Sequence, residues 1–168
     1  ALSQGEFEKP ALVFLHRSVR CPSFRAARAR VHSIRLCQKR GCFWYSGRRF
    51  NIKYRECDPF MRIISLNANG IRAAARKGFF TWMHAQKADF VCIQETKAQL
   101  PQLSDPQFHP EGYHVYYHDA VKKGYSGVAL YSRYEPDRVQ HGLGWPLMDD
   151  EGRWLQVDVG NLSVVSLY

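Results

Sequence analysis

From residue 61 onward, apolar and polar residues alternate in short blocks. Arg62–Leu66 is rich in isoleucine and is followed by Asn67-Ala68-Asn69-Gly70, which predicts a strand and then a turn. The next apolar residues recur three and four positions apart, so they predict an amphipathic helix that ends near Lys87 and contains Gly78 at some cost in stability. These apolar residues are Ile71, Ala75, Phe79, Trp82 and Met83.

Several further segments have the composition of strands. Two of them are joined by Gly160-Asn161, a dipeptide typical of a two-residue hairpin turn. Many strands with few helices predict a layered α/β sandwich rather than a doubly wound nucleotide-binding sheet. The predicted strands are Phe90–Ile93, Tyr113–His118, Gly127–Ser132, Trp154–Val159 and Leu162–Leu167.

The positive charge of the chain is concentrated in its first third. Residues 1–60 contain 13 lysines and arginines against four acids, whereas residues 61–168 contain 11 basic and 11 acidic residues. The net charge of +9 therefore lies entirely in residues 1–60. A basic field attracts phosphate backbones, but it gives no information about the function of residues 61–168.

Residues 1–60 show no sustained period of 2 or 3.6. Their arginine-rich, acid-poor composition is compatible with an organellar transit peptide or with a basic nucleic-acid-binding arm. A third interpretation, which we favour, is a non-native or disordered extension translated ahead of the true start. The chain opens on Ala1, and Met61 falls at the first residue of a predicted strand. We therefore divide the chain into an extension, 1–60, and a domain, 61–168.

The cysteines do not indicate a metal site. Four of them precede Met61 without the CxxC pairing of zinc sites, and no signal peptide favours disulfides. Cys92 lies in an apolar run and is expected in the core. The early apolar run Ala11–Leu15 is too short for a membrane span, so we expect a soluble, cytoplasmic monomer. The four early cysteines are Cys21, Cys37, Cys42 and Cys57.

Polar side chains follow three of the predicted buried strands. Asn67, Glu95 and Tyr168 each come at or just after a strand end, where ligands usually bind in layered α/β proteins. A carboxylate, a carboxamide and a phenol at one edge fit a magnesium ion that shares a phosphate. Each residue also has an ordinary explanation, as a turn asparagine, an exposed loop acid and a strand-end aromatic residue.

Four segments resemble the signatures of exonuclease III-type apurinic/apyrimidinic endonucleases, a branch of the endonuclease/exonuclease/phosphatase superfamily. The resemblance extends from Met61 to Tyr168 and excludes residues 1–60. It implies a four-layer α/β sandwich, of which residues 61–168 are the N-terminal half. The segments are 64–73 (ISLNANGIRA), 93–97 (IQETK), 124–130 (GYSGVAL) and 164–168 (VVSLY).

The resemblance implies a role for each matching residue. Glu95 corresponds to the metal-binding glutamate, and Asn67 to an active-site asparagine that helps to orient the metal. Tyr168 corresponds to the tyrosine beside the scissile phosphate. The residues implied to contact DNA are Asn69 (aspartate in some members), Arg72, Ala73, Lys77 and Tyr125.

The implied reaction is hydrolysis of the phosphodiester 5′ to an abasic site, 3′-5′ exonuclease action, or both. The implied cofactor is Mg²⁺, with Mn²⁺ as a substitute, and the implied partner is double-stranded DNA with abasic sites or 3′ ends. The family takes its general base from a downstream Asp-x-Asn segment and polarises the phosphate with an Asp-His pair. Neither follows Glu95 here, so we expect little or no activity from this chain alone.

Two alternative functions and two other candidate sites remain. The functions are a phosphodiesterase or phosphatase of the same superfamily, and a non-catalytic basic protein that binds nucleic acid through residues 1–60. His114 and His118 share a strand face and could suggest a metal pair, but a solvated strand edge is the simpler prediction. The acidic run Asp149-Asp150-Glu151 is expected to be an exposed turn between strands.

Overall fold

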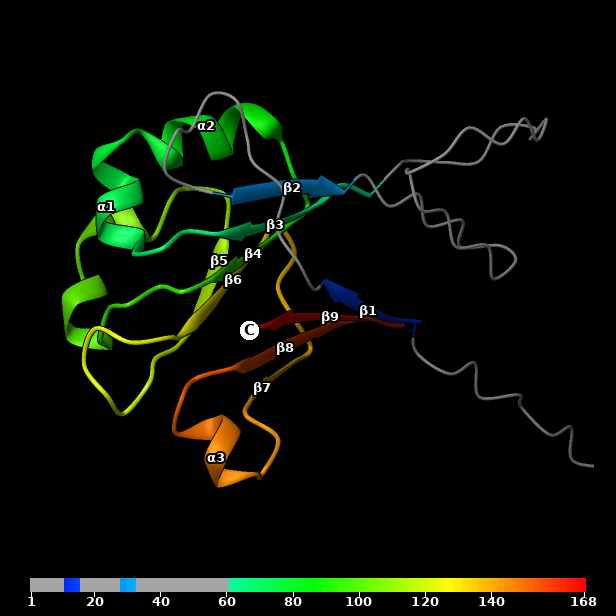
Figure 1. Ribbon diagram of the computed structural model, residues 1–168. Helices are drawn as coiled ribbons and strands as arrows, with labels where there is room; N and C mark the ends of the chain where they lie inside the picture. Colours follow the sequence, from blue (N-terminus) through cyan, green and yellow to red (C-terminus); the bar gives the residue numbers. More distant parts are fainter. Residues whose placement is uncertain (1–10, 16–27, 33–60) are drawn as a thin grey trace, which may run out of the picture.

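Two β-sheets stack on each other, and two helices cover the outer face of the larger sheet (Figure 1). The computed structural model describes residues 11–15, 28–32 and 61–168, with side chains from residue 61 onward. The described residues form three layers of the predicted α/β sandwich: helices, a five-stranded sheet and a four-stranded sheet.

The five-stranded sheet has the order β2-β3-β4-β6-β5, in which β3 and β4 are parallel and the other neighbours are antiparallel. The four-stranded sheet has the order β1-β9-β8-β7, in which only β1 and β9 are parallel. The strands are β1 Ala11–Leu15, β2 Arg28–His32, β3 Ile63–Asn67, β4 Phe90–Gln94, β5 His114–His118, β6 Val128–Ser132, β7 Arg138–His141, β8 Trp154–Val159 and β9 Leu162–Leu167.

The central strands have side chains in two cores. In β3, Ile63 points between the two sheets and Ile64 points toward the helices, and both are fully buried. β4 alternates in the same way, with Cys92 between the sheets. Because both faces are covered, these strands appear in the sequence as continuous apolar runs. Burial raises the pKa of the Cys92 thiol to about 12, so Cys92 is a core residue, as predicted.

The segment expected to form one helix forms two. Helix α1 covers Ile71–Arg76 and α2 covers Phe79–Gln86. Gly78 has φ +81°, a left-handed conformation that an α-helix cannot contain, so the chain turns there and restarts. The end of α2 at Gln86, next to Lys87, agrees with the prediction. The described helices include none that is long and apolar enough to cross a membrane.

Other elements have no clear sequence signal. β7 contains one aliphatic residue, Val139, and is only partly buried. β1 and β2 fall in residues 1–60, where no periodic pattern is found, and they pair with β9 and β3. Cys21, Cys37, Cys42 and Cys57 lie outside the described residues. The remaining elements are the short helix α3, Pro146–Asp149, and the 3-10 turns η1, Leu100–Leu103, and η2, Pro106–Phe108.

Candidate active site

Three strands bring the predicted site residues together. Asn67 is the last residue of β3, Glu95 follows β4, and Tyr168 follows β9 in the other sheet. Nδ2 of Asn67 donates to Oε1 of Glu95 over 2.6 Å, and the hydroxyl of Tyr168 donates to the same oxygen over 2.9 Å. The Glu95 carboxylate is therefore held by one donor from each sheet.

The amide of Asn67 is fixed in the orientation that this contact needs. Its Oδ1 accepts the backbone NH of Asn69 over 3.0 Å, so its Nδ2 faces Glu95. The loop after β3 is in turn fastened to the loop after β4. Gly70 N donates to the carbonyl of Glu95 over 2.8 Å, and Ile71 N donates to the carbonyl of Thr96 over 2.9 Å.

Lys97 is a site residue that the sequence analysis did not assign. Its Nζ lies 2.8 Å from Oε2 of Glu95 and donates to Oδ1 of Asn69 over 2.6 Å. Lys97 thus connects Glu95 to Asn69, which was predicted to contact DNA. The available signal was the position of a lysine two residues after the glutamate within the quoted segment 93–97.

The surroundings of Glu95 favour its charged form. Partial burial acts to raise its pKa, but hydrogen bonds from Asn67, Lys97 and Tyr168, together with the charge of Lys97, outweigh burial and lower it. The pKa of Tyr168 is raised, first by burial and then by its contact with Glu95. At neutral pH the site therefore contains an ionised carboxylate and a protonated phenol that donates to it.

The loops around Glu95 have a strained backbone. Glu95 has φ +54° and Lys97 φ +47°, and Asn69 and Ser126 also have positive φ. Residues with side chains avoid this region at a cost of about 1–3 kcal/mol each, and such strain clusters at functional sites. The strained loops support one another, because Thr96 N donates to the carbonyl of Gly127 and Lys97 N to that of Ser126.

Arg153 extends the site and was also not predicted. Its guanidinium carbon lies 5.0 Å from the centre of the Tyr168 ring, and its Nη2 is 3.3 Å from the hydroxyl of Tyr125. Glu151 forms an ion pair with it. Arg153 therefore links Tyr125, a predicted DNA contact, to Tyr168.

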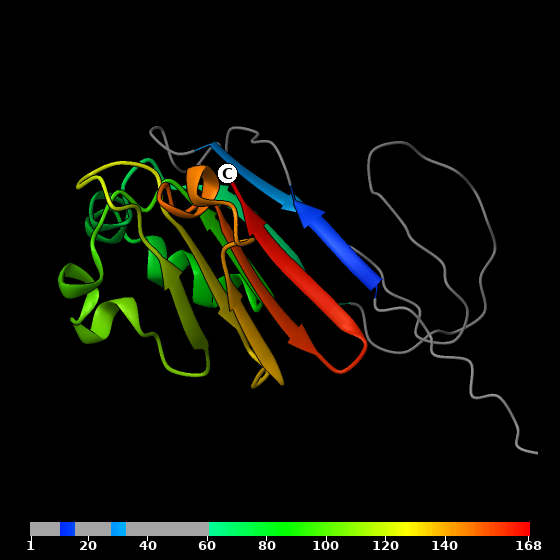
Figure 2. The same ribbon diagram turned by 90° about the horizontal axis from the view of Figure 1, so that it is seen from below.

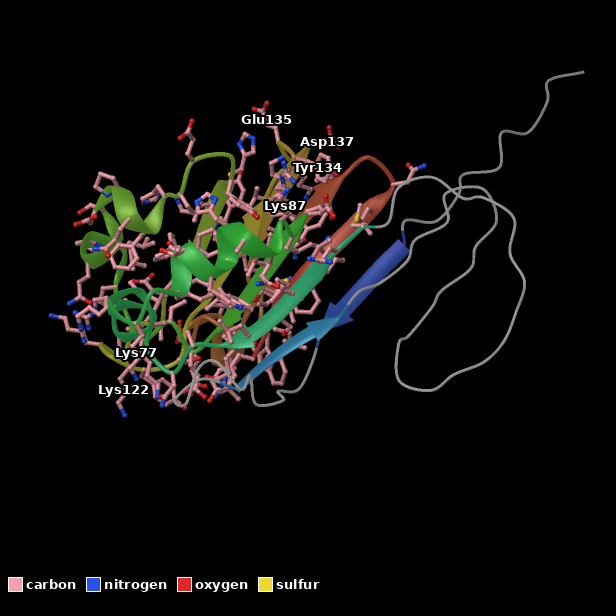
Figure 3. The ribbon with its side chains drawn as sticks, turned by 90° about the horizontal axis from the view of Figure 1, so that it is seen from above. Lys77, Lys87, Lys122, Tyr134, Glu135 and Asp137 are labelled. Atoms are coloured by element: carbon pink, nitrogen blue, oxygen red, sulfur yellow. The ribbon has the colours of Figure 1, made fainter. Side chains whose placement is uncertain are left out.

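The remaining predicted DNA contacts lie on α1 or, for Lys77, directly after it. Arg72 and Lys77 are exposed, and Ala73 is half-buried. Among the described residues, the partners of the Glu95 side chain are Asn67, Tyr168 and Lys97. Arg72, Ala73 and Lys77 do not contact it through hydrogen bonds. Lys77 and Lys122 lie at one end of the molecule, whereas Lys87, Tyr134, Glu135 and Asp137 lie toward the other (Figure 3).

The two other candidates do not form a metal site in the structure. His114 is exposed on the edge strand β5, as predicted, whereas His118 is half-buried and its Nδ1 lies 2.7 Å from the carbonyl oxygen of Trp154. Asp149 ends α3 and accepts the backbone NH of Leu143, while Asp150 is exposed in the turn before β8. Within residues 61–168, no three histidine, cysteine or acidic side chains are grouped so that they could hold a metal.

The donor set around Glu95 fits magnesium rather than zinc. Mg²⁺ is commonly bound by one or two carboxylates, keeps several waters and shares phosphate oxygens. Glu95 supplies one ionised carboxylate at a partly exposed position. The Oδ1 atom of Asn67 already accepts the backbone NH of Asn69. In this structure Asn67 therefore contacts the Glu95 carboxylate through Nδ2 and is not placed as a second metal ligand.

Comparison with known proteins identifies the family of residues 64–168. The sequence profile of the Endonuclease/Exonuclease/phosphatase family matches residues 64–168. An exodeoxyribonuclease of Bacillus subtilis is 44% identical over 109 residues, which are 64% of this chain and 42% of that protein. A DNA-(apurinic or apyrimidinic site) endonuclease of Dictyostelium discoideum is 30% identical over 108 residues, which are 64% of this chain and 30% of that protein.

A solved structure shows the same fold. An AP endonuclease from Archaeoglobus fulgidus superposes with a TM-score of 0.57 and 32% sequence identity, and the match covers 64% of this chain and 40% of that one. The chain therefore spans less than half the length of these relatives.

Proposed function

Because this chain belongs to the Endonuclease/Exonuclease/phosphatase family, we propose that residues 61–168 form part of a magnesium-dependent DNA-repair nuclease. Its substrate is double-stranded DNA with abasic sites or 3′ ends. Its reaction is hydrolysis of the phosphodiester 5′ to an abasic site, 3′-5′ removal of nucleotides, or both. The similarity to an exodeoxyribonuclease and to an AP endonuclease supports this class of substrate.

One observation carries the proposal. The Glu95 carboxylate is ionised, partly exposed, and held by Asn67 from one sheet and Tyr168 from the other. Two neutral donors that fix Oε1, with Lys97 on Oε2, indicate a carboxylate positioned to bind a cation and a phosphate.

Each residue then has a defined task. Glu95 would hold the metal, and Asn67 and Tyr168 would keep its carboxylate in place, because they donate to it. When bound, Mg²⁺ acts as a Lewis acid on a phosphate oxygen. The Tyr168 hydroxyl lies beside the same carboxylate, and in this structure its single proton is donated to Glu95. Lys97, Lys77 and Arg72 supply positive charge at this end of the molecule, where phosphate contacts would position the duplex.

A general base is still required to activate water. No Asp-x-Asn segment follows Glu95 in this sequence. We therefore expect these 168 residues alone to cleave abasic-site DNA slowly or not at all in the presence of Mg²⁺. Rapid cleavage by the purified chain would contradict this part of the proposal.

A chimera tests the nuclease assignment. Residues 61–168 replace the matching segment of the Bacillus subtilis exodeoxyribonuclease, which is 44% identical over 109 residues. The folded chimera should cut an abasic-site duplex with Mg²⁺, and the same chimera with Glu95→Gln should be inactive. A folded chimera that hydrolyses only a small phosphomonoester would instead support the phosphatase alternative. Equal cleavage with and without Glu95→Gln would rule out the role of Glu95.

A further inference from the structure

Three large apolar side chains project from the connection between β7 and β8. Leu143, Trp145 and Leu147 are 45%, 56% and 66% exposed. They fall within five consecutive residues that contain no charge. An isolated exposed leucine is ordinary, whereas large exposed apolar patches mark interaction sites.

The connection is built to hold these side chains outward. Oδ1 of Asp149 accepts the backbone NH of Leu143 over 2.8 Å, and Asp149 N donates to the carbonyl of Trp145 over 3.0 Å. A Cβ at Gly142 would lie 2.5 Å from the Asp149 carboxylate, so only glycine allows this close approach. Trp145 is therefore presented by an ordered loop.

This loop adjoins the candidate active site. Val121, which is 78% exposed, donates its NH to the carbonyl of Asp150 over 2.8 Å. Tyr168 N donates to the carbonyl of Arg153 over 3.0 Å. Figures 1 and 2 show α3, the connection between β5 and β6, and the end of β9 at the same end of the molecule. We call Val121, Tyr125, Leu143, Trp145 and Leu147 the Trp145 patch.

Positive charge lies next to Tyr125 in the patch. Lys122 and Lys123 are exposed, and Nζ of Lys122 lies 5.2 Å from the centre of the Tyr125 ring. Of the acids nearby, Glu151 pairs with Arg153, Asp149 accepts an NH from the loop, and Asp150 is exposed. Exposed aromatic rings beside lysines are the combination that binds unstacked bases and their phosphates.

We propose that the Trp145 patch binds an unstacked base of the DNA strand next to the candidate active site. Trp145 stacks on the base, and Lys122 and Lys123 contact the adjacent phosphates. This inference rests on the proposed function, since it extends the same DNA surface beyond Tyr125. A duplex with an abasic site offers a suitable base, because the nucleotide opposite the lesion has no pairing partner and leaves the stack at lower cost than a paired one.

The test compares binding of the 168-residue chain and its variants to a fluorescent single strand and to a duplex with a tetrahydrofuran abasic analogue. Trp145→Ala should weaken binding about 5- to 100-fold, as loss of one stacked base implies. It should leave the slope of log Kd against log salt unchanged, because no charge is lost. Lys122→Ala should instead reduce that slope by about one. Trp145→Phe should retain most of the affinity.

Tyr134→Ala is the matched control, since Tyr134 is 44% exposed and lies toward the other end of the molecule (Figure 3). The basic residues 1–60 are identical in all these proteins and cancel in the comparison. Equal affinities for Trp145→Ala and Tyr134→Ala would overturn the inference and leave the nuclease proposal standing. No DNA binding by any of the proteins would overturn both. If Trp145→Ala lowers the oligomeric mass of the protein in solution and leaves its DNA affinity unchanged, the patch is instead a contact between copies of the chain.

Discussion

Nδ2 of Asn67 lies 2.6 Å from Oε1 of Glu95, a residue 28 positions further along the chain. β3 and β4 are parallel neighbours, with Asn67 opposite Gln94, so the contact follows from strand register. The Asn67 amide cannot rotate without losing the NH of Asn69. The arrangement is therefore set by backbone structure and precedes any ligand.

Asn67→Ala should weaken Mg²⁺ binding about 10- to 100-fold, the usual effect of removing a group that orients a metal ligand. The reason is that Oε1 of Glu95 would keep only the Tyr168 hydroxyl as a side-chain donor. Calorimetric titration with Mg²⁺ or Mn²⁺ measures the change. Asn161→Ala, in the exposed hairpin turn, is the control and should bind the metal normally. Unchanged affinity in Asn67→Ala would contradict the role of the Asn67 amide.

Lys97→Met should raise the pKa of Glu95 more than Tyr168→Phe does. Lys97 lowers that pKa through both a hydrogen bond and its charge, whereas Tyr168 contributes a hydrogen bond alone. A depressed carboxyl pKa stabilises the fold above the unfolded pKa, and this stability is lost as pH falls through the folded pKa. As the pH is lowered, both variants should therefore lose this stability at a higher pH than the unmodified chain does.

Carboxyl ¹³C chemical shifts followed against pH measure this difference in the Glu95 pKa directly. Lys87→Met removes an exposed lysine that precedes β4, at the opposite end of this strand from Glu95, and should leave the Glu95 titration unchanged. A larger shift for Tyr168→Phe than for Lys97→Met would reverse the predicted order.

Gly127→Ala should destabilise the fold more than Gly160→Ala. Both glycines have positive φ, +83° and +54°, so both variants introduce backbone strain of about 1 kcal/mol. A Cβ at Gly127 would also lie 2.3 Å from Oγ1 of Thr96, whereas one at Gly160 would meet nothing within 4 Å. Urea unfolding should show an additional loss of about 1–3 kcal/mol for Gly127→Ala. Equal losses would show that Thr96 moves aside freely.

Much of the fold follows from residues whose burial is visible in the sequence. β3, β4 and β6 are apolar on both faces because a helix layer and a second sheet cover them. The break at Gly78 was harder to predict, since the apolar spacing continues across it into α2. β7 is held mainly by its backbone pairing with β8. Its one aliphatic residue, Val139, is too weak a pattern to predict a strand from the sequence.

The candidate site could be predicted only in part. Asn67, Glu95 and Tyr168 stand at strand ends, and the structure brings them together. The position of Arg153 could have been predicted from the sequence. The turn Gly160-Asn161 pairs Val159 with Leu162. Counting six residues back from Val159 and six forward from Leu162 places Arg153 opposite Tyr168. For Lys97 the sequence offered only its position two residues after the glutamate, and the composition does not indicate the left-handed backbone that Glu95 and Lys97 both adopt.

The central claim is that Glu95 binds a divalent ion between Asn67 and Tyr168. Titration of the ¹⁵N-labelled chain with Mn²⁺ tests it most directly, because the paramagnetic ion broadens signals from nearby atoms. We predict saturable broadening of the backbone amides of residues 67–70 and 95–97 and of the Asn67 side-chain amide, which Glu95→Gln abolishes and excess Mg²⁺ reverses. Broadening that persists in Glu95→Gln, or that appears elsewhere in residues 61–168 instead, would contradict the claim.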